Sequence, residues 1–366
     1  MIGLVSTFNV FCGIATYSEH LVEHFEKGSI QVFANDLKNL SDTKSSDIHR
    51  VSRCWERTGD FKRLQQAILQ SGVTGVHFQH EFGLFQNHEA FCELLKTLYN
   101  NRISIYITFH TVFANNIENN KIYDYAKYCT RIIVHSQAAK DQLNLNEKCV
   151  MIPHGSVKVD RVAKFVARKH LNIPRDSFLA LTFGFITPNK GALDNINVVL
   201  NLKNDFPDLK LLIAGMPMVH GDNFDNLSYA LSLFKYLRKR KGWDSVDIIM
   251  KYIPEWELDY YAGAADIAIE NYYQTNYSTS GMSHLVMSYG LPSVSSRSNI
   301  LTDLNEERSL KYDVNDIQGM EMNLLRLLRD KNLREQMSKN CLRYAEQTSW
   351  ENIAQKHIGL YEGKTI

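Results

Sequence analysis

The chain has 366 residues, of which 44% are hydrophobic and 22% charged, and its 41 Lys and Arg against 40 Asp and Glu give a net charge of +1. A strong basic excess is typical of dedicated nucleic-acid-binding proteins, so this balance argues against nucleic acid as a partner. A length of this order predicts two domains of about 100–200 residues each. No apolar run reaches the roughly 18 residues of a transmembrane helix, and MIGLVSTF lacks the basic and apolar regions of a signal peptide.

The six cysteines indicate a reducing compartment. None of them form a C-x-x-C pair, and several lie inside apolar stretches, where cysteine behaves as a small core residue. Clustered zinc-ligand spacing is absent as well. We therefore expect a cytoplasmic protein without a disulfide framework and without a zinc site.

Apolar, strand-like runs alternate with amphipathic helical patterns in the first part of the chain. Strands are predicted at residues 2–6, 73–79, 103–109 and 131–135, and helices at 14–25, 87–98 and 137–143. The strands are almost continuously apolar, which is typical of a parallel sheet buried between two layers of helices.

Residues 155–174 interrupt this alternation with a basic, polar stretch. It contains Lys158, Arg161, Lys164, Arg168 and Lys169. The composition favours a linker, with a surface helix as the alternative. The positive charge is compatible with peripheral contact to a membrane surface, although such a run is more often a solvated face.

The alternation resumes in the second part. Strands are predicted at 178–183, 209–214, 246–250, 267–270 and 293–296, and helices at 191–203, 226–239 and 282–289, followed by a mostly helical tail from 314 to 362. Two successive αβ alternations predict an α/β protein with two Rossmann-like domains that face each other across a cleft.

Polar residues and a glycine follow the strands of the first part. Gly13 opens a helix after the first strand, so the backbone there can approach a ligand closely. His80 and Glu81 follow one strand, and His110 follows the next. Ligands bind outside the carboxyl ends of strands in open α/β sheets, so we expect these residues at the cleft edge.

Two segments of the second part have the character of an anion site. In TFGFITPNKG, Gly184 follows a strand and Lys190 enters a helix, where its ammonium could reach a diphosphate; the spacing is not that of a Walker A motif. In the second segment, Thr279, Ser280 and Gly281 precede an apolar helical pattern, and the free amides of such a helix start form an anion cradle. A plain helix cap is the alternative.

These segments in this order resemble the GT-B fold glycosyltransferases of glycosyltransferase family 4, the retaining, group 1 type. The resemblance spans nearly the whole chain and rests on GIATYSEHL, FHTVF, IIVHSQAAKDQL, MIPHG, FGFITPNKG, LLIAG, ADIAIENYYQTNYSTSGMSHLVMSYGLPSV and TSWENIAQKHIGLYE. It implies an N-terminal, acceptor-side domain of residues 1–156 with the C-terminal helix 349–366, which crosses back to it. Residues 174–348 would be the domain that binds the nucleotide sugar.

The resemblance also implies an activity: transfer of a sugar from a UDP- or GDP-type donor to a carbohydrate or glycoconjugate, without a cofactor or a metal at the chemical centre. The resemblance implies catalytic His110 and Lys190 and donor-binding Gly13, Ser280, Gly281 and Met282. To these we add donor-binding Gly184, Glu270 and Thr279 and acceptor-side His80 and Glu81 as candidates from their places in the sequence.

The sequence departs from the family pattern at three positions. Phe185 stands where the family often has Arg, and Tyr277 and Leu285 stand where it has the two glutamates of its E-x7-E motif. Glu270 is a candidate to replace one of these acidic groups. The departures keep an alternative open, namely a GT-B subunit that binds a sugar nucleotide or glycan with little or no catalysis. A two-lobed binding protein of the periplasmic type is a third alternative, disfavoured by the crossing C-terminal helix.

Overall fold

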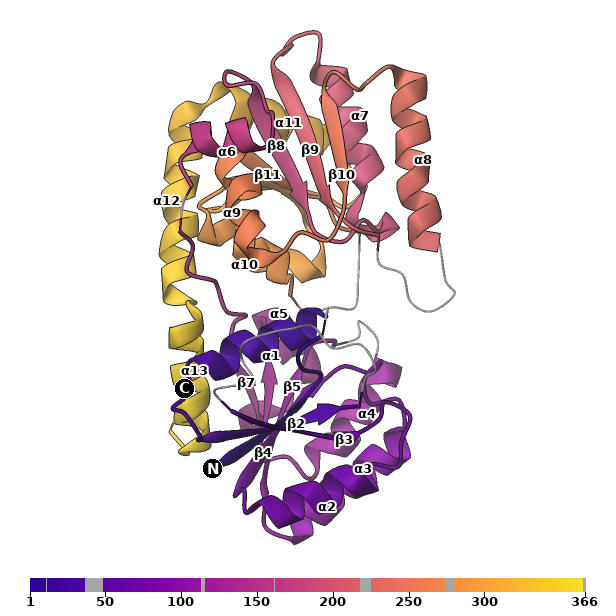
Figure 1. The fold of residues 1–366 in the computed structure, drawn as a ribbon, viewed down its shortest axis with the longest axis vertical. Coiled ribbons are helices and arrows are strands. Elements are labelled where there is room, and N and C mark those ends of the chain that lie inside the picture. The colour runs from indigo at the N-terminus through magenta and orange to yellow at the C-terminus, as the bar shows by residue number, and fades with distance from the viewer. Residues whose placement is uncertain are drawn as a thin grey trace. The chain divides into compact units, whose positions relative to one another are not determined.

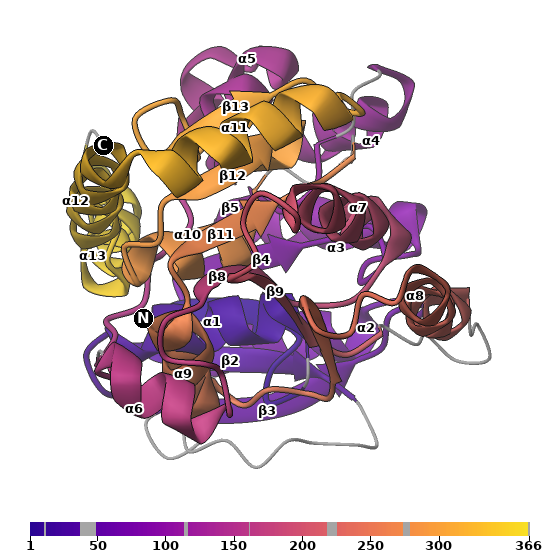
Figure 2. The same cartoon turned by 90° about the horizontal axis from the view of Figure 1, so that it is seen from above.

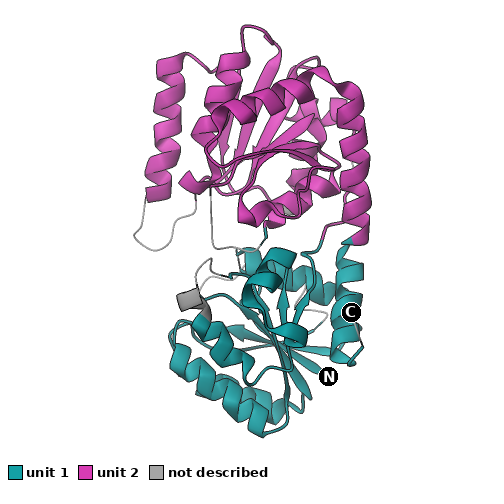
Figure 3. Ribbon diagram, turned by 180° about the vertical axis from the view of Figure 1, so that it is seen from behind, with its two compact units in different colours: residues 1–155, 276–279, 348–366 teal, residues 156–275, 280–347 magenta. Residues whose placement is uncertain are grey.

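The computed structural model describes residues 1–10, 12–36, 49–112, 116–160, 162–217, 225–273 and 279–364, without the side chains of 116–119 and 255. The chain divides into two compact units (Figure 3). Unit 1 comprises Met1–Gly155, Asn276–Thr279 and Thr348–Ile366, and unit 2 comprises Ser156–Thr275 and Ser280–Gln347. Apart from Asn276–Thr279, the chain thus belongs to unit 2 from residue 156 until it returns to unit 1 at residue 348.

Unit 1 is built on a parallel sheet of seven strands in the order β3-β2-β1-β4-β5-β6-β7 (Figure 1). The strands are β1 (Ile2–Ser6), β2 (Ile30–Asn35), β3 (Arg50–Trp55), β4 (Gly75–His80), β5 (Ser104–Phe109), β6 (Arg131–Val134) and β7 (Cys149–Met151). The parallel sheet confirms the prediction from the apolar runs.

Helices cover both faces of this sheet. The helices are α1 (Gly13–Glu23), α2 (Lys62–Ser71), α3 (His88–Asn100), α4 (Asn116–Ala126), α5 (Gln137–Leu143) and α13 (Trp350–Tyr361), with a short 3-10 helix η2 (Asn146–Lys148). Side chains alternate between faces along a strand. Val76 and Phe78 therefore join the core under α2, α3, α4 and α5, whereas His77 points to the other face and bonds Tyr361 of α13.

Unit 2 contains a second parallel sheet of six strands in the order β10-β9-β8-β11-β12-β13. The strands are β8 (Phe178–Phe183), β9 (Leu209–Gly215), β10 (Val246–Met250), β11 (Ile267–Glu270), β12 (Ser293–Ser296) and β13 (Ser309–Tyr312). In both sheets the order reverses beside the first strand, between β1 and β4 and between β8 and β11. This reversal is the Rossmann-type switch point at which open α/β sheets bind ligands.

Two helical layers enclose the sheet of unit 2 (Figure 2). One face packs against α7 (Ala192–Leu202), α8 (Asp225–Arg240) and α11 (Ile317–Arg329), and the other against α6 (Lys164–His170), α9 (Glu255–Ala264) and α10 (Gly281–Ser288). The long helix α12 (Lys331–Gln347) contacts α10. Two 3-10 helices, η3 (Pro188–Lys190) and η4 (Asn299–Leu301), complete the unit.

The basic stretch after residue 155 is not simply a linker, because α6 forms within it. The expectation of a linker is wrong here, and the alternative of a helix holds. Asp266 explains the helix: its carboxylate lies 2.7 Å from Lys164 Nζ and 2.7 Å from Arg168 Nη2, and Arg168 is buried. Two of the charges thus anchor α6 to unit 2 instead of forming an open basic surface.

The C-terminal helix α13 packs in unit 1 as the resemblance implies. Ser349 caps it by accepting a bond from Asn352 N, and the helix lies against α1. Its Trp350, Ile353 and His357 are buried. Among the described residues, no helix combines the length and the apolar character that crossing a bilayer requires.

Candidate functional site

Two glycines, Gly184 and Gly215, allow a close backbone approach at the switch point of unit 2. Gly184, directly after β8, has φ of +104°, and a Cβ on it would lie 2.6 Å from Lys190 Nζ and 3.0 Å from Met282 Cγ. A Cβ on Gly215 would lie 1.9 Å from the Gly184 carbonyl oxygen. Because neither position has room for a side chain, the packing brings together three residues that the sequence predicted for one site: Gly184, Lys190 and Met282.

Lys190 places a positive charge at this point. It ends η3 and is half-buried. Its ammonium lies 5.2 Å from the ring centroid of Tyr272 and 3.5 Å from the carbonyl oxygen of Phe183. An ammonium held over an aromatic face and beside one carbonyl keeps donors for an anionic ligand.

The N-terminus of α10 lies next to Lys190 through Met282. Ser280 is its N-cap, and the hydroxyl accepts a bond from Ser283 N at 3.3 Å. Gly281, the first helical residue, is exposed, and Thr279 before the cap is half-buried. The amides of Gly281 and Met282 have no acceptor within the helix by its geometry, so they and the helix dipole favour an anion. Ser280 thus acts as a helix cap, and the amides of Gly281 and Met282 are left for an anion.

Glu270 lies at the end of β11, on the other strand of the switch point. It is 2% exposed and accepts a bond from Ser283 Oγ at 3.3 Å. Burial raises the pKa of its carboxyl to about 7, although Lys190, the Ser283 hydroxyl and Lys311 all oppose the rise. The sequence proposed Glu270 as a substitute for a missing glutamate, and the structure connects it to α10.

Lys311 is a residue that sequence reasoning missed. The strand register pairs Glu270 with Ser295 and Ser295 with Lys311, so the two charged residues share a row and a face of the sheet. They are roughly 10 Å apart across two strand spacings. Burial lowers the pKa of Lys311 to about 8, and its ammonium donates to the Leu301 carbonyl at 3.0 Å. No signal in the sequence identifies this pairing, because it depends on the order of three strands.

The Lys311→Met variant tests this electrostatic link. The ammonium of Lys311 favours the ionised form of Glu270, so its removal should raise the pKa of Glu270 further. The neutral-range midpoint of a pH profile of donor hydrolysis should move to higher pH by the same amount. Glu270→Gln is the control, since it should remove this midpoint. An unchanged midpoint in Lys311→Met would show that Lys311 does not act on Glu270.

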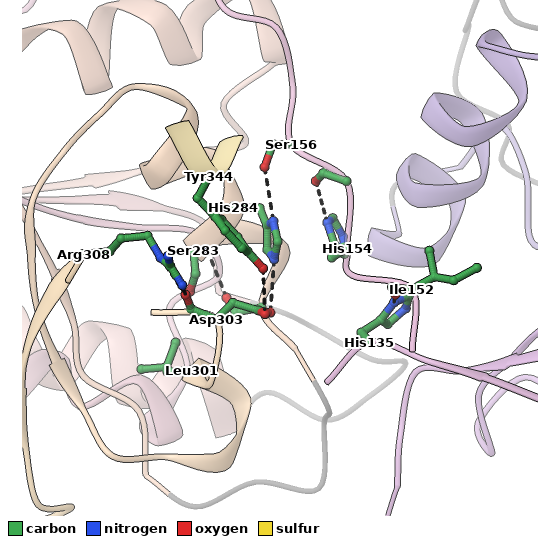
Figure 4. Close-up of polar contacts among 12 residues, drawn as sticks. His135, Ile152, His154, Ser156, Ser283, His284, Leu301, Asp303, Arg308 and Tyr344 are labelled. Carbon is green, nitrogen blue, oxygen red and sulfur yellow. Dashed lines mark hydrogen bonds and ion pairs between the residues drawn. The ribbon is translucent and has the colours of Figure 1, made fainter. Parts of the chain in front are cut away.

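A buried polar network fixes the position of α10 within unit 2 (Figure 4). Nδ1 of His284 lies 3.2 Å from Ser156 Oγ, and Nε2 lies 3.2 Å from Asp303 Oδ2. The other oxygen of Asp303 accepts a bond from Tyr344 OH at 2.9 Å, and Arg308 stacks on the Tyr344 ring at 4.1 Å.

The residue types of this network are those of a Ser-His-Asp triad, but Ser156 and His284 are each only 1% exposed. A buried hydroxyl cannot reach a substrate, so the network positions the helix instead of acting as a nucleophile. It links α10 to Ser156, the first residue of unit 2, and to α12, the last helix of that unit.

In unit 1, His110 lies directly after β5 as predicted. Its Nε2 donates to Gln79 Oε1 at 2.9 Å, and its backbone N–H donates to the His80 carbonyl. Burial lowers the pKa of His110 well below its usual value, and His135 and His154 lower it further. The ring is therefore neutral near pH 7, with Nδ1 as the acceptor.

His80 is not at an accessible edge, so the expectation of an acceptor-side contact is corrected here. It ends β4 as predicted, but its ring is fully buried. The ring stacks on Phe85 at 5.3 Å and touches Phe91 and Phe109. Among the described residues neither ring nitrogen has a hydrogen-bond partner. His80 is a core residue that helps to place His110 through its backbone carbonyl.

Glu81 is half-buried and stabilises the segment beside His110. Its Oε2 accepts a bond from Thr111 Oγ1 at 2.5 Å, and its Oε1 accepts one from Phe82 N at 3.1 Å. Burial raises the pKa of the carboxyl. Gly13 is exposed at the start of α1, whose N-cap Cys12 makes no side-chain capping bond. A Cβ on Gly13 would meet none of the described atoms within 4 Å, so this helix end is open to a ligand.

Four rings surround Tyr17 of α1, forming a cluster that sequence reasoning did not assemble. His110, His135, His154 and Trp350 have ring centroids at 5.0, 5.2, 5.2 and 4.9 Å from that of Tyr17. His135 Nδ1 donates to the Ile152 carbonyl and His154 Nδ1 to the Gly155 carbonyl (Figure 4). Although the cluster is rich in histidine, no group of three or more His, Cys, Asp or Glu in the described ranges is arranged to hold a metal ion.

The fold and a family match define the class of the protein. Residues 164–343, just under half of the chain, match the family model described as glycosyl transferases group 1. Two Rossmann-like units, the second of which carries this match, constitute the GT-B fold. The chain is accordingly a transferase of the glycosyltransferase class with the GT-B fold. None of the curated proteins matches the sequence significantly.

Solved structures share this fold over essentially the whole chain. A glycosyltransferase from Rickettsia africae has a TM-score of 0.80 at 13% identity, covering 99% of this chain and 97% of the other. The Anabaena protein Alr3699/HepE in complex with UDP has a TM-score of 0.79 at 13% identity, with 99% of both chains covered. Sucrose-phosphate synthase from Thermosynechococcus elongatus has a TM-score of 0.76 at 16% identity, covering 99% and 98%. At such identities the likeness concerns the fold.

Proposed function

We propose that the protein transfers a sugar from a nucleoside-diphosphate sugar to an acceptor hydroxyl with retention of configuration, as in glycosyltransferase family 4. One observation carries the proposal: Lys190, the N-terminus of α10 and the close-packed Gly184 lie together at the switch point of unit 2. This arrangement suits a diphosphate, which needs a point charge, free amides and backbone without side chains. Stabilising the charge on the departing diphosphate is the main catalytic demand.

The chemistry proposed needs no metal and no cofactor, because Lys190 and the dipole of α10 supply the positive potential. The acceptor hydroxyl attacks from the face of the leaving group, and a phosphate oxygen of the leaving diphosphate takes its proton. The bond from the anomeric carbon to the phosphate oxygen breaks as the new glycosidic bond forms. His110, Gly13, Ser280, Gly281, Met282, Thr279 and Glu270 would line the donor.

The proposed donor is a UDP- or GDP-sugar, and the acceptor a carbohydrate or glycoconjugate. Support for UDP comes from the Anabaena relative, whose structures are described with UDP and with UDP-glucose. We propose a cytoplasmic location with peripheral contact to a membrane, and no nucleic-acid partner. The domain limits 1–156 with 349–366, and 174–348, remain our proposal for the functional division.

A second candidate function is a GT-B subunit that binds a sugar nucleotide or glycan without turnover. The residues at the positions of the missing Arg and of the second glutamate favour it: Phe185 is uncharged, and Leu285 belongs to the apolar packing under α10. Tyr277, at the position of the first glutamate, lies outside the described residues.

Donor hydrolysis separates the two functions. UDP-, GDP-, ADP- and dTDP-sugars would be incubated with the protein and the released nucleotide measured by mass spectrometry. Hydrolysis of one donor class is expected, and His110→Ala should lower its rate by at least about tenfold while the chain stays folded, since a neutral imidazole contact to the donor is lost. Tight nucleotide binding without turnover of any donor would favour the non-catalytic function instead.

A further inference from the structure

Helix α8 carries a concentration of positive charge that the proposed function does not use. Five of the seven residues from 235 to 241 are Lys or Arg and none is acidic, although the whole chain has a net charge of only +1. All five are exposed. Within the described part of the chain none of the five forms an ion pair, while Arg240 donates to Tyr236 OH at 2.6 Å. The charge is thus segregated at one end of one helix.

Apolar side chains are exposed beside these charges. Leu231 is 48% exposed and Trp243, just after the helix, is 44% exposed. The spacing of Leu231, Lys235 and Arg238 is i, i+4 and i+7, which places them on one stripe of the helix. Trp243 contacts Phe234 of α8 at a centroid distance of 5.7 Å. The opposite stripe is buried in unit 2, with Ala230, Leu233 and Leu237 in the core.

The nearby acidic residue Asp244 does not neutralise the positive charge of residues 235–241. Asp244 follows Trp243, but its carboxylate pairs with Lys203, and its carbonyl accepts a bond from Lys210. Basic residues in the last turn of a helix also stabilise its dipole. That role accounts for Arg238, Lys239 and Arg240, but not for Lys235, Lys241 or the exposed Leu231 and Trp243.

We propose that the outer face of α8, together with Lys241 and Trp243, docks on an anionic lipid bilayer. We call this surface the α8 face. A row of Lys and Arg with an indole and an aliphatic side chain at its margin matches the anionic headgroup layer of a membrane. In unit 2, α8 lies at the margin of the sheet, next to the edge strand β10 (Figures 1 and 2). A nucleic acid would bind the exposed Lys and Arg side chains but would not require the exposed aliphatic side chain of Leu231.

This surface differs from the basic stretch at residues 158–169, where Asp266 engages Lys164 and Arg168. Exposed residues of that stretch, together with the nearby Arg175, provide a matched control with the same charge change on the same unit. The test variant is R238A/K239A/K241A, and the control is K158A/K169A/R175A, in which all three residues are exposed as well.

The experiment is co-sedimentation of the full chain with phosphatidylcholine vesicles, with and without roughly one-third phosphatidylglycerol. Wild type and control should bind the anionic vesicles only, and binding should fall as salt rises. The α8 variant should bind them on the order of 100-fold more weakly, at about fivefold per charge removed. In a Trp256→Phe background, which removes the other exposed tryptophan, the fluorescence of Trp243 should shift to the blue on binding.

Equal binding to neutral vesicles, retained binding in the α8 variant, or loss only in the control would overturn the proposal. Tighter binding to a single-stranded RNA than to anionic vesicles would also overturn it, in favour of a nucleic-acid surface. Circular dichroism checks that both triple variants are folded. Donor hydrolysis should be the same in both variants as in wild type, because the α8 face lies outside the proposed donor site. Vesicle binding without any donor hydrolysis in wild type would refute the proposed function and leave this surface standing.

Discussion

Lys190→Ala is expected to lower donor turnover by at least about 100-fold, the scale on which the loss of one preorganised charge-stabilising donor affects catalysis. Lys190 is the one residue predicted from the sequence that both carries a positive charge and lies against Gly184 and Met282 in the structure. Its charge would act on the leaving diphosphate, where negative charge grows as the bond to the sugar breaks. The effect should therefore fall mainly on kcat.

Lys158→Ala, a change at an exposed lysine of the same unit, is the matched control and should leave turnover unchanged. Lys190→Arg keeps the charge but fills more space beside the closed backbone at Gly184, so an intermediate rate is expected. Binding of the nucleotide, measured by calorimetry, should weaken less than turnover does. A rate near wild type in Lys190→Ala would refute the placement of the diphosphate at α10.

The free energy of unfolding of unit 1 should fall steeply as the pH falls, although the whole chain has a net charge of only +1. Burial lowers the pKa of His77 and of His80 to about 3, and the pKa of His357 lies well below the usual value for the same reason. Above pH 6.5 both folded and unfolded chains carry these rings neutral. Below it the unfolded chain binds protons that the folded chain excludes, so stability falls with falling pH, by about 1.4 kcal/mol per pH unit for each ring.

Between pH 7 and pH 5, the free energy of unfolding of unit 1 should therefore fall by about 2 kcal/mol for each of these histidines. Urea unfolding followed by tryptophan fluorescence measures this in unit 1, because Trp55 and Trp350 are buried there while Trp243 and Trp256 are exposed in unit 2.

The variant His80→Phe isolates the contribution of one ring. The ring of His80 already sits among Phe85, Phe91 and Phe109, so phenylalanine should fit and should remove two buried nitrogens without partners among the described residues. In His80→Phe, the fall in the free energy of unfolding between pH 7 and pH 5 should be smaller than in wild type by about 2 kcal/mol. His24→Phe, at an exposed site, should leave it unchanged. An equal loss in His80→Phe and wild type would show that the ring of His80 does not contribute.

Apolar patterning predicted most of the fold because buried parallel strands are locally recognisable. Runs such as Phe178–Phe183 and Leu209–Gly215 are apolar almost throughout. The edge strand Arg50–Trp55 was not predicted, since only its last two residues are buried and its sequence RVSRCW is mixed. The linker expectation failed at α6 because Asp266, about 100 residues later in the chain, neutralises Lys164 and Arg168.

The places of the candidate site residues in the fold were predictable where they depend on local segments. Gly184 follows a strand, Lys190 ends a 3-10 helix and Ser280 caps a helix, so their positions could be inferred from neighbouring residues. Lys311 could not be inferred, because its row with Glu270 is set by the order of β11, β12 and β13. His80 was placed at the correct strand end, but whether the ring faces the edge or the core depends on Phe85 and Phe91 packing over it.

Unit 1 is assembled from segments separated by roughly 190 residues of unit 2, which has a consequence for synthesis on the ribosome. Residues 1–155 emerge first. Tyr17 can contact Trp350, and His77 can bond Tyr361, only after residues 348–361 have been synthesised. At about 5–20 residues per second, this delay is roughly 10–40 s. During that interval the nascent sheet lacks α13, and His77, Tyr106 and Tyr17 lack its covering side chains. We expect this half-built unit to be the stage at which the chain depends most on chaperones.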